Sequence, residues 1–343
     1  MQPLLDLNLT DMWWADNNVE LLTNGNFEGA AGPPPAGWSL FHSVMTREAG
    51  TRTGGSGSYV GRVAYDGVNA AGIGYEAACT VGRRYHALTW MKSDGVGIPT
   101  LADGVGGTYW TGLASVTWQG ADTILTASSA NMCLMCNNLA AGRYIDADDL
   151  SLQEQFMYTR NRGLLGQTPA TQRVQVGDGR TAASFPTMLN LTQSPRKGMS
   201  FDGANQYLQY NTPIPSGTYT FCMLAQRGNV GASSRLILDC RASGGSGDIY
   251  LSAGLSQVIA DGGGTVYMDN VAAPDMSLGR LYFVAVAGIT LSAPGVTYFF
   301  RHNAAAANIW LGNVFGLRLD AGTLTPRQLS DVRQRMLAEI YSP

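Results

Sequence analysis

The sequence predicts an all-β protein, with two β-sandwich (jelly-roll) domains in tandem and one short C-terminal helix. Apolar and polar residues alternate through most of the chain, and Gly, Asn, Asp or Pro interrupts the alternation roughly every ten residues, which is typical of short antiparallel strands. Only 14% of the residues are charged, against about 25% in an average soluble domain. Gly, Ser, Thr and Asn replace the missing charges, and this composition favours strands and turns over helices.

The length predicts more than one domain. At 343 residues the chain exceeds the size at which a single hydrophobic core usually keeps growing. Between residues 155 and 197, prolines, glycines and several arginines replace the alternation, as in a connector without its own core. The predicted organisation is an N-terminal arm at 1–18, a first domain at 19–154, a linker at 155–197 and a second domain at 198–343.

The first domain opens with ELLTNGNFEGAAGPPPAGW, residues 20–38. Its three consecutive prolines lack amide donors and force extended backbone, so the segment is expected to be a strand, a tight turn and an extended loop. Further on, RYHALTWMKSD alternates over residues 84–94. On the expected strand His86, Leu88 and Trp90 share one face, and Tyr85, Ala87, Thr89 and Met91 share the other.

The C-terminal helix is predicted from TLTPRQLSDVRQRMLAEIY. Thr325 suits the N-cap, Pro326 suits the first turn, and Gln328 is placed to close a capping box. Apolar residues then recur at spacings of three and four, at Leu329, Val332, Met336 and Ile340. We expect this narrow stripe to pack on a sheet of its own domain.

Charge and cysteine content exclude several classes. A net charge of -3 provides no basic field, so no nucleic acid binding is expected. The N-terminus does not resemble a secretory signal, and no run reaches the ~20 apolar residues that membrane insertion needs. Five irregularly spaced cysteines do not indicate a disulfide framework. Cys133 and Cys136, within NMCLMC, are expected in a buried strand in preference to a redox or metal site.

The segments LLTNGNFE, YHALTWMKS and RYIDADDLSL, in this order, resemble the jelly-roll carbohydrate-binding modules with a galactose-binding-like fold, over residues 19–154. The resemblance implies that Glu28 lies close to Asp148 and Asp149, and such carboxylates repel unless a cation intervenes. The family often holds a structural Ca²⁺ there, so Glu28 and Asp149 are the implied ligands. The extra Ala147 in the acidic run departs from the family motif. Alternatively, the acids are solvated turn residues.

Aromatic side chains are the candidate sugar-binding groups, because their faces stack on the apolar faces of sugar rings. Tyr109 and Trp110 lie in the Gly-rich segment DGVGGTYWTG, which we interpret as an exposed loop. They are therefore the predicted ligand-binding residues. Trp38, Trp90 and Trp118 match family positions that mostly pack inside, and we expect them in the core.

The second half, with KGMSFDGANQYLQY and NIWLGNVFGLRLDAGTLTPRQLSDV, resembles the concanavalin A-like, laminin-G-like sandwich domains. Gln206 stands where that family commonly has an acid, which argues against a calcium-assisted ligand site. No strand carries the closely spaced acids of glycoside-cleaving relatives. Asp239 and Asp248 adjoin turn residues and suit loop caps, so no enzyme activity is expected.

The two resemblances imply a non-enzymatic bacteriophage virion structural protein. It would decorate the head or form part of a tail fibre, assemble in the host cytoplasm with other virion proteins, and bind host-surface glycans. Trp13 and Trp14 in the arm would anchor on a neighbour, and exposed sheet edges favour a homo-oligomer, expected to be a trimer. The alternatives are a capsid cement protein without sugar binding and an accessory carbohydrate-binding module of a secreted glycan-processing system.

Overall fold

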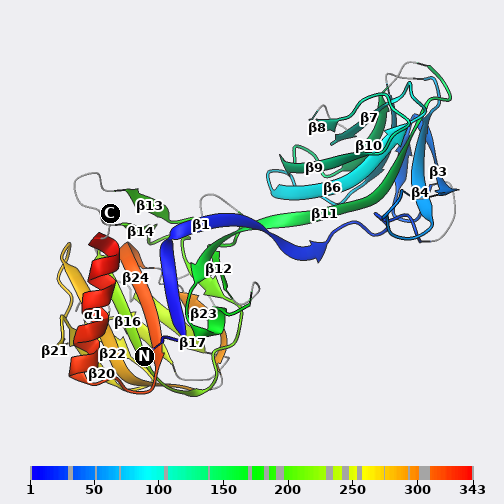
Figure 1. The fold of residues 1–343 in the computed structure, drawn as a ribbon. Helices are drawn as coiled ribbons and strands as arrows, with labels where there is room; N and C mark the ends of the chain where they lie inside the picture. Colours follow the sequence, from blue (N-terminus) through cyan, green and yellow to red (C-terminus); the bar gives the residue numbers. More distant parts are fainter. Residues whose placement is uncertain are drawn as a thin grey trace. The chain divides into compact units, whose positions relative to one another are not determined.

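The computed structural model is built from antiparallel strands and, within the residues described, one α-helix (Figure 1). The predicted all-β class with a C-terminal helix is confirmed. The structure describes residues 2–29, 34–50, 52–68, 71–103, 107–137, 140–168, 172–180, 185–190, 197–228, 235–241, 247–252, 257–273, 275–292, 294–300 and 310–341. In these ranges no helix has the length and apolar character to cross a membrane.

The chain forms two compact units, and one is inserted into the sequence of the other. Asp16–Phe156 make the N-terminal sandwich, whereas Met1–Ala15 and Met157–Pro343 together make the C-terminal sandwich. Strands β1 (Leu5–Glu20) and β11 (Tyr144–Asn161) each contribute residues to both units. The chain therefore passes twice between them.

The segments predicted as an arm and a linker contain strands. The start of β1 pairs with β24 (Leu311–Ala321), with Leu5 opposite Leu319. Within residues 155–197, β12 (Arg173–Val176) pairs with β15 and β13 (Thr187–Asn190) pairs with β14. Backbone groups of these strands thus extend both sheets of the C-terminal unit, which satisfies their hydrogen-bonding needs.

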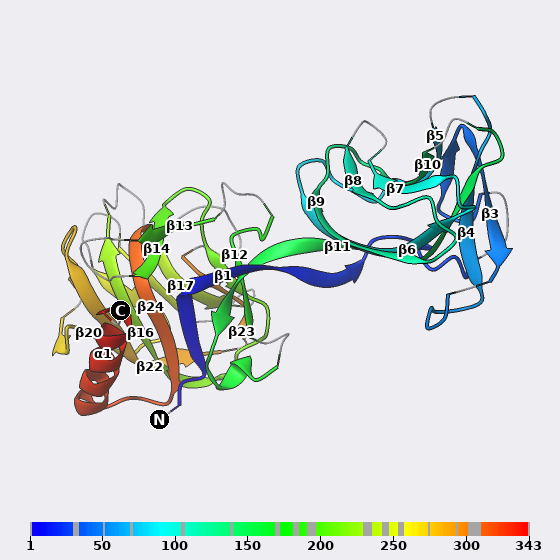
Figure 2. The same cartoon turned by 45° about the horizontal axis from the view of Figure 1, so that its top comes forward.

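Two antiparallel sheets form the N-terminal sandwich (Figure 2). The first has the order β3-β4-β11-β6-β9, and the second β2-β5-β10-β7-β8. Their strands are β2 (Ser39–Phe41), β3 (Ser43–Ala49), β4 (Tyr59–Tyr65), β5 (Ala71–Glu76), β6 (Arg84–Ser93), β7 (Ile98–Ala102), β8 (Thr108–Thr111), β9 (Gln119–Thr126) and β10 (Met132–Asn137).

The opening stretch contributes to the core of this sandwich. Phe27 is fully buried with a left-handed backbone (φ 58°), and its ring centroid lies 5.5 Å from that of Trp38. Trp38 is buried too, and its indole Nε1 donates a hydrogen bond to the Asn24 carbonyl at 3.3 Å. The core position predicted for Trp38 is confirmed.

The cysteine motif lies on β10, as the sequence predicts. Cys133 and Cys136 are buried free thiols, and burial raises the pKa of each to about 12. A thiol that resists ionisation is a poor nucleophile and a poor metal ligand. These two residues therefore act as small apolar core groups.

The C-terminal sandwich also has two sheets around one core. One contains the order β14-β24-β16-β22-β20, and the other β12-β15-β23-β17-β18-β19. The elements are η1 (Leu164–Gly166), β14 (Lys197–Asp202), β15 (Leu208–Tyr210), β16 (Gly217–Arg227), β17 (Arg235–Arg241), β18 (Asp248–Leu251), β19 (Val258–Ala260), β20 (Thr265–Met268), β21 (Val271–Ala272), β22 (Leu281–Leu291), β23 (Pro294–Phe299) and α1 (Pro326–Tyr341).

Helix α1 begins and packs as its sequence predicts. The Gln328 side-chain oxygen accepts the Thr325 amide at 2.9 Å, and the Gln328 amide donates to the Thr325 hydroxyl at 3.4 Å, which closes the capping box. All four residues of the predicted stripe are buried. They pack on the outer face of β16, β22 and β24 against Leu224, Phe283 and Phe315.

Candidate functional site

Exposed apolar side chains lie on the outer face of β6 and β9, where inward and outward residues alternate. The inward residues of β6, Tyr85, Ala87, Thr89 and Met91, are all buried, which confirms the predicted alternation. On the outward side Leu88 and Trp90 are each 39% exposed. The neighbouring Ile124 on β9 is 43% exposed. The core position predicted for Trp90 is therefore wrong.

Register makes these residues one continuous strip, which we call the Trp90 face: His86, Leu88, Trp90 and Lys92 of β6 with Trp118, Gly120, Asp122 and Ile124 of β9 and its preceding loop. Leu88 lies opposite Asp122, and Trp90 lies opposite Gly120. A Cβ at Gly120 would touch the far edge of the Trp90 indole at 3.4 Å, an ordinary contact distance. The indole therefore lies across the neighbouring strand at this position.

Cations stack on the aromatic rings of this sheet. The Arg52 guanidinium lies 4.5 Å from the Trp90 ring centroid, and the Lys92 ammonium lies 4.8 Å from that of Trp118. On the adjacent strands Arg62 lies 3.9 Å from the Tyr144 ring. Each contact is worth about 0.5–1 kcal/mol when exposed, and it fixes the orientation of the ring.

Carboxylates hold these cations in place. Asp146 on β11 is buried, and its two oxygens accept hydrogen bonds from Arg62 at 2.7 and 3.0 Å. Lys92 lies 3.7 Å from the same carboxylate. Hydrogen bonding to Asp146 raises the pKa of Arg62 further above its usual value. The result is a pre-oriented platform of apolar rings among charged hydrogen-bonding groups, which suits a polar ligand that also has apolar faces.

Tyr109 and Trp110 lie on strand β8, where the sequence led us to expect a loop. Trp110 is opposite Leu101, and both rings pack against the domain core. The Tyr109 hydroxyl donates to the buried Asp103 carboxylate at 3.0 Å, and burial raises the pKa of Tyr109. Both side chains are half-buried, so they present less free ring surface than Trp90.

Glu28 and Asp149 converge on one loop, between β3 and β4. The Glu28 carboxylate accepts the amides of Ser58 and Tyr59 at 2.7 and 2.8 Å. Asp149 accepts the Ser56 amide and the Arg52 guanidinium, each at 3.1 Å. Asp149 has a left-handed backbone (φ 50°) at a bulge in β11, which turns it out of the ladder.

This corner is arranged around N–H donors. Amides and Arg52 supply the positive potential that the resemblance assigned to Ca²⁺, whereas a calcium site would turn the carboxylate oxygens toward the ion. Among the residues described, no three His, Cys, Asp or Glu side chains form a metal-binding group. Calcium ligation by Glu28 and Asp149 stays a prediction.

Trp13 and Trp14 have neighbours within their own unit. The Trp13 ring lies 6.3 Å from that of Tyr158, with the Arg160 guanidinium 5.3 Å from its centroid. The Trp14 ring meets that of Phe185 edge-on at 5.6 Å. Their predicted role as anchors on another protein stays a prediction.

Two acids of the C-terminal sandwich were misjudged from the sequence. Asp239 lies inside β17 and Asp248 begins β18, and the two buried acids are directly opposite each other in paired strands. They continue a row of polar residues across adjacent strands, with Gln209 and Tyr298. The sequence held a signal for this row, because each member follows or precedes an apolar core residue in its strand.

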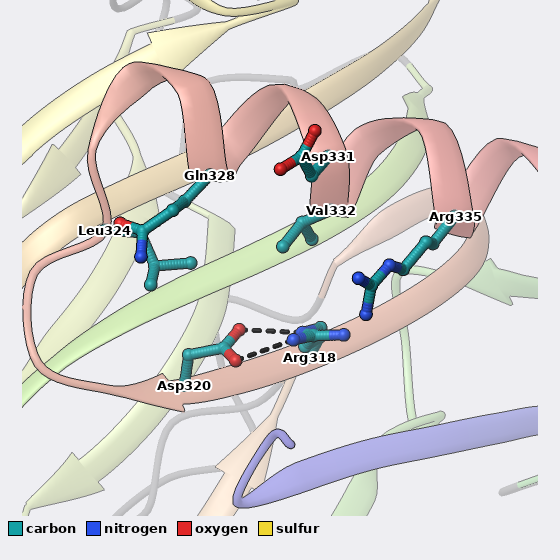
Figure 3. Close-up of a pocket in the computed structure, with 7 residues that line it drawn as sticks. All are labelled: Arg318, Asp320, Leu324, Gln328, Asp331, Val332 and Arg335. Atoms are coloured by element: carbon teal, nitrogen blue, oxygen red, sulfur yellow. Dashed lines mark hydrogen bonds and ion pairs between the residues drawn. The ribbon is translucent and has the colours of Figure 1, made fainter. Parts of the chain in front are cut away.

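A hollow of about 80 Å³ lies between α1 and β24. Figure 3 shows Arg318 and Asp320 joined by two hydrogen bonds, of 2.7 and 2.8 Å, with Arg335 and Asp331 on the helix. Two cations and two anions line it, so the hollow has no net charge to select an ionic ligand. The Arg318–Asp320 ion pair is itself nearly buried and lies on β24, on the side of the hollow opposite α1.

Comparisons with known proteins give weak likenesses. No family model matches the chain, and no curated protein matches it. Among solved structures, the N-terminal CBM22-1–CBM22-2 tandem of Paenibacillus barcinonensis Xyn10C aligns with 90% of this chain and 99% of its own, at 11% identity and a TM-score of 0.34.

Two larger proteins are similar over part of their length. An arabinose-bound α-L-arabinofuranosidase, MgGH51, has a TM-score of 0.32 at 14% identity over 39% of this chain, and a Paenibacillus xanthan lyase has 0.21 at 14% over 78%. The chain spans 26% of each. At such TM-scores we draw nothing about function from these likenesses.

Proposed function

We propose that the N-terminal sandwich binds carbohydrate through the Trp90 face. The observation that carries the proposal is the exposed indole of Trp90, held by Arg52 on a strand whose inward residues are all buried. The contact with Arg52 contributes only about 0.5–1 kcal/mol to stability. A sugar ring would cover the remaining exposed indole surface and offer hydroxyls to the neighbouring charged groups. This assigns the ligand contact to Trp90 in preference to Tyr109 and Trp110.

At the level of the whole protein we propose a non-enzymatic virion structural protein that touches host-surface glycans. Low charge and the two sandwich units support this reading, and the remaining expectations, virion location, partner virion proteins and a trimer, belong to the same proposal. The alternatives stay a cement protein without sugar binding and an accessory module of a glycan-processing system.

A glycan array with the whole chain tests the proposal. Wild type should bind a defined set of glycans, and Trp90→Ala should weaken binding at least tenfold, about 1.4 kcal/mol. Phe41→Ala is the matched control, because Phe41 is an aromatic residue 51% exposed on the other sheet of the same unit. It should bind like wild type.

Two outcomes would overturn the assignment. In the first, Trp110→Ala abolishes binding and Trp90→Ala does not, which would place the site on β8. Trp110→Ala must then unfold at the same urea concentration as wild type, so that the loss is not due to misfolding. Silence of the wild-type chain on the whole array would remove carbohydrate binding and favour the cement protein.

A further inference from the structure

His86 lies between two carboxylates that come from different strands. Its Nδ1 is 2.8 Å from the Asp16 carboxylate of β1, and its Nε2 is 2.9 Å from the Asp122 carboxylate of β9. In the sheet β1 is the neighbour of β11, and β11 is the neighbour of β6. Asp16 therefore reaches past one strand to meet His86, and the imidazole ties β1 to β6 and β9 through side chains.

Both contacts are favourable only for the charged ring. A neutral imidazole has one N–H and one lone pair, so it can donate to a single carboxylate and turns its lone pair toward the other. The imidazolium donates from both nitrogens, and each such charge-assisted hydrogen bond is stronger than a neutral one. The two distances together fit the doubly protonated ring.

The surroundings strengthen this arrangement. Gln155 of β11 donates to the other oxygen of Asp16 at 3.2 Å, and it accepts a hydrogen bond from Arg84 at 2.9 Å. The two charged groups that hydrogen-bond the ring are the carboxylates of Asp16 and Asp122. Partial burial works against the charge, but hydrogen bonds and attraction from Asp16 and Asp122 outweigh it and raise the pKa of His86.

We propose that Asp16, His86 and Asp122 form a pH-sensitive clamp that fastens the end of β1 to the N-terminal sandwich. Asp16 is the first residue of that unit, where the chain enters it from the C-terminal one, so the clamp secures the entry strand. The proposal does not depend on carbohydrate binding.

The direction of the pH dependence follows from the raised pKa. A histidine whose pKa is higher in the folded than in the unfolded protein stabilises the fold fully below the unfolded-state pKa of about 6.5. This stabilisation disappears as the pH rises through the folded-state pKa. The clamp is therefore closed below about pH 6.5 and opens as the pH rises through the raised pKa of His86.

Histidine NMR of the whole chain, followed against pH, tests the protonation step. The His86 signal, assigned by its loss in His86→Gln, should titrate above about 6.5, the usual pKa of a histidine. A His86 signal that titrates at or below that value would overturn the proposal.

Hydrogen exchange tests whether loss of the His86 proton loosens the end of β1. Amides at the end of β1, residues 16–20, should exchange several-fold faster above the His86 transition than the intrinsic pH effect predicts. This excess should vanish in His86→Gln and in Asp16→Asn, and it should persist in His42→Gln. An excess that survives in His86→Gln would show that another group opens β1.

Discussion

Two sheets of this protein present apolar outer faces, and the chain treats them differently. The face of β16, β22 and β24 carries Leu224, Phe283 and Phe315, and α1 covers it with its buried stripe. The face of β6 and β9 carries Leu88, Trp90 and Ile124, all more than a third exposed. One face is completed by the fold, and the other is available to a ligand. The difference distinguishes apolar residues that stabilise the fold from those that we propose bind a ligand.

Replacing one leucine on each face should give the largest measurable difference between the two faces. Leu329→Ala in α1 should cost about 2–5 kcal/mol in the free energy of unfolding, because it opens a cavity under the helix. Leu88→Ala should change it by less than about 0.5 kcal/mol, since the side chain is already exposed. Urea unfolding of both variants measures the contrast. Equal costs would mean that the Trp90 face is also covered.

Calcium offers the second test, because the predicted site lies in one unit only. If Glu28 and Asp149 bind it, Ca²⁺ at 100 times its Kd should stabilise the N-terminal unit by about 2.7 kcal/mol. Thermal unfolding with Ca²⁺ and with a chelator measures this, and Glu28→Gln should abolish the difference. Identical melting in both solutions would rule out calcium binding by these acids, whose partners in the structure are Arg52, loop amides and the Ser56 hydroxyl.

Thiol labelling gives a smaller effect and separates the units. Cys133 and Cys136 report on the N-terminal unit, and Cys222 and Cys240 report on the C-terminal one. Burial raises the pKa of Cys133, Cys136 and Cys240 to about 12, so at pH 8 native protein should label very slowly. Leu329→Ala should speed the labelling of Cys222 and Cys240 only. Faster labelling of Cys133 and Cys136 as well would show that the two units unfold together.

The sequence predicted correctly those features that depend on residues close to one another in the chain. The capping box and stripe of α1, the alternation of β6 and the burial of Cys133 and Cys136 each depend on neighbours within a few residues. The pairing of Leu5 with Leu319 does not, and no feature of residues 1–18 indicates it. Strand partners so distant in sequence are selected by the assembled sheet.

The candidate site was predicted in part for the same reason. The sequence placed His86, Leu88 and Trp90 on one face but could not tell which face the second sheet would cover. Glu28 and Asp149 both contact the loop between β3 and β4, and their role as a calcium site stays a prediction. The contact of Arg52 with Asp149 depends on the path of that loop. Asp239 and Asp248 look isolated until the register of β17 and β18 sets them opposite each other.

The insertion of one unit within the other has a consequence for synthesis. β1 is synthesised before the other strands described here, and β24, with which Leu5–Leu7 pair, is synthesised after them. Asp16–Phe156 can complete their own sandwich before the β24 partner of Leu5–Leu7 exists. Removal of Leu5–Leu7 would therefore damage the C-terminal unit, although these residues precede the N-terminal one in the sequence.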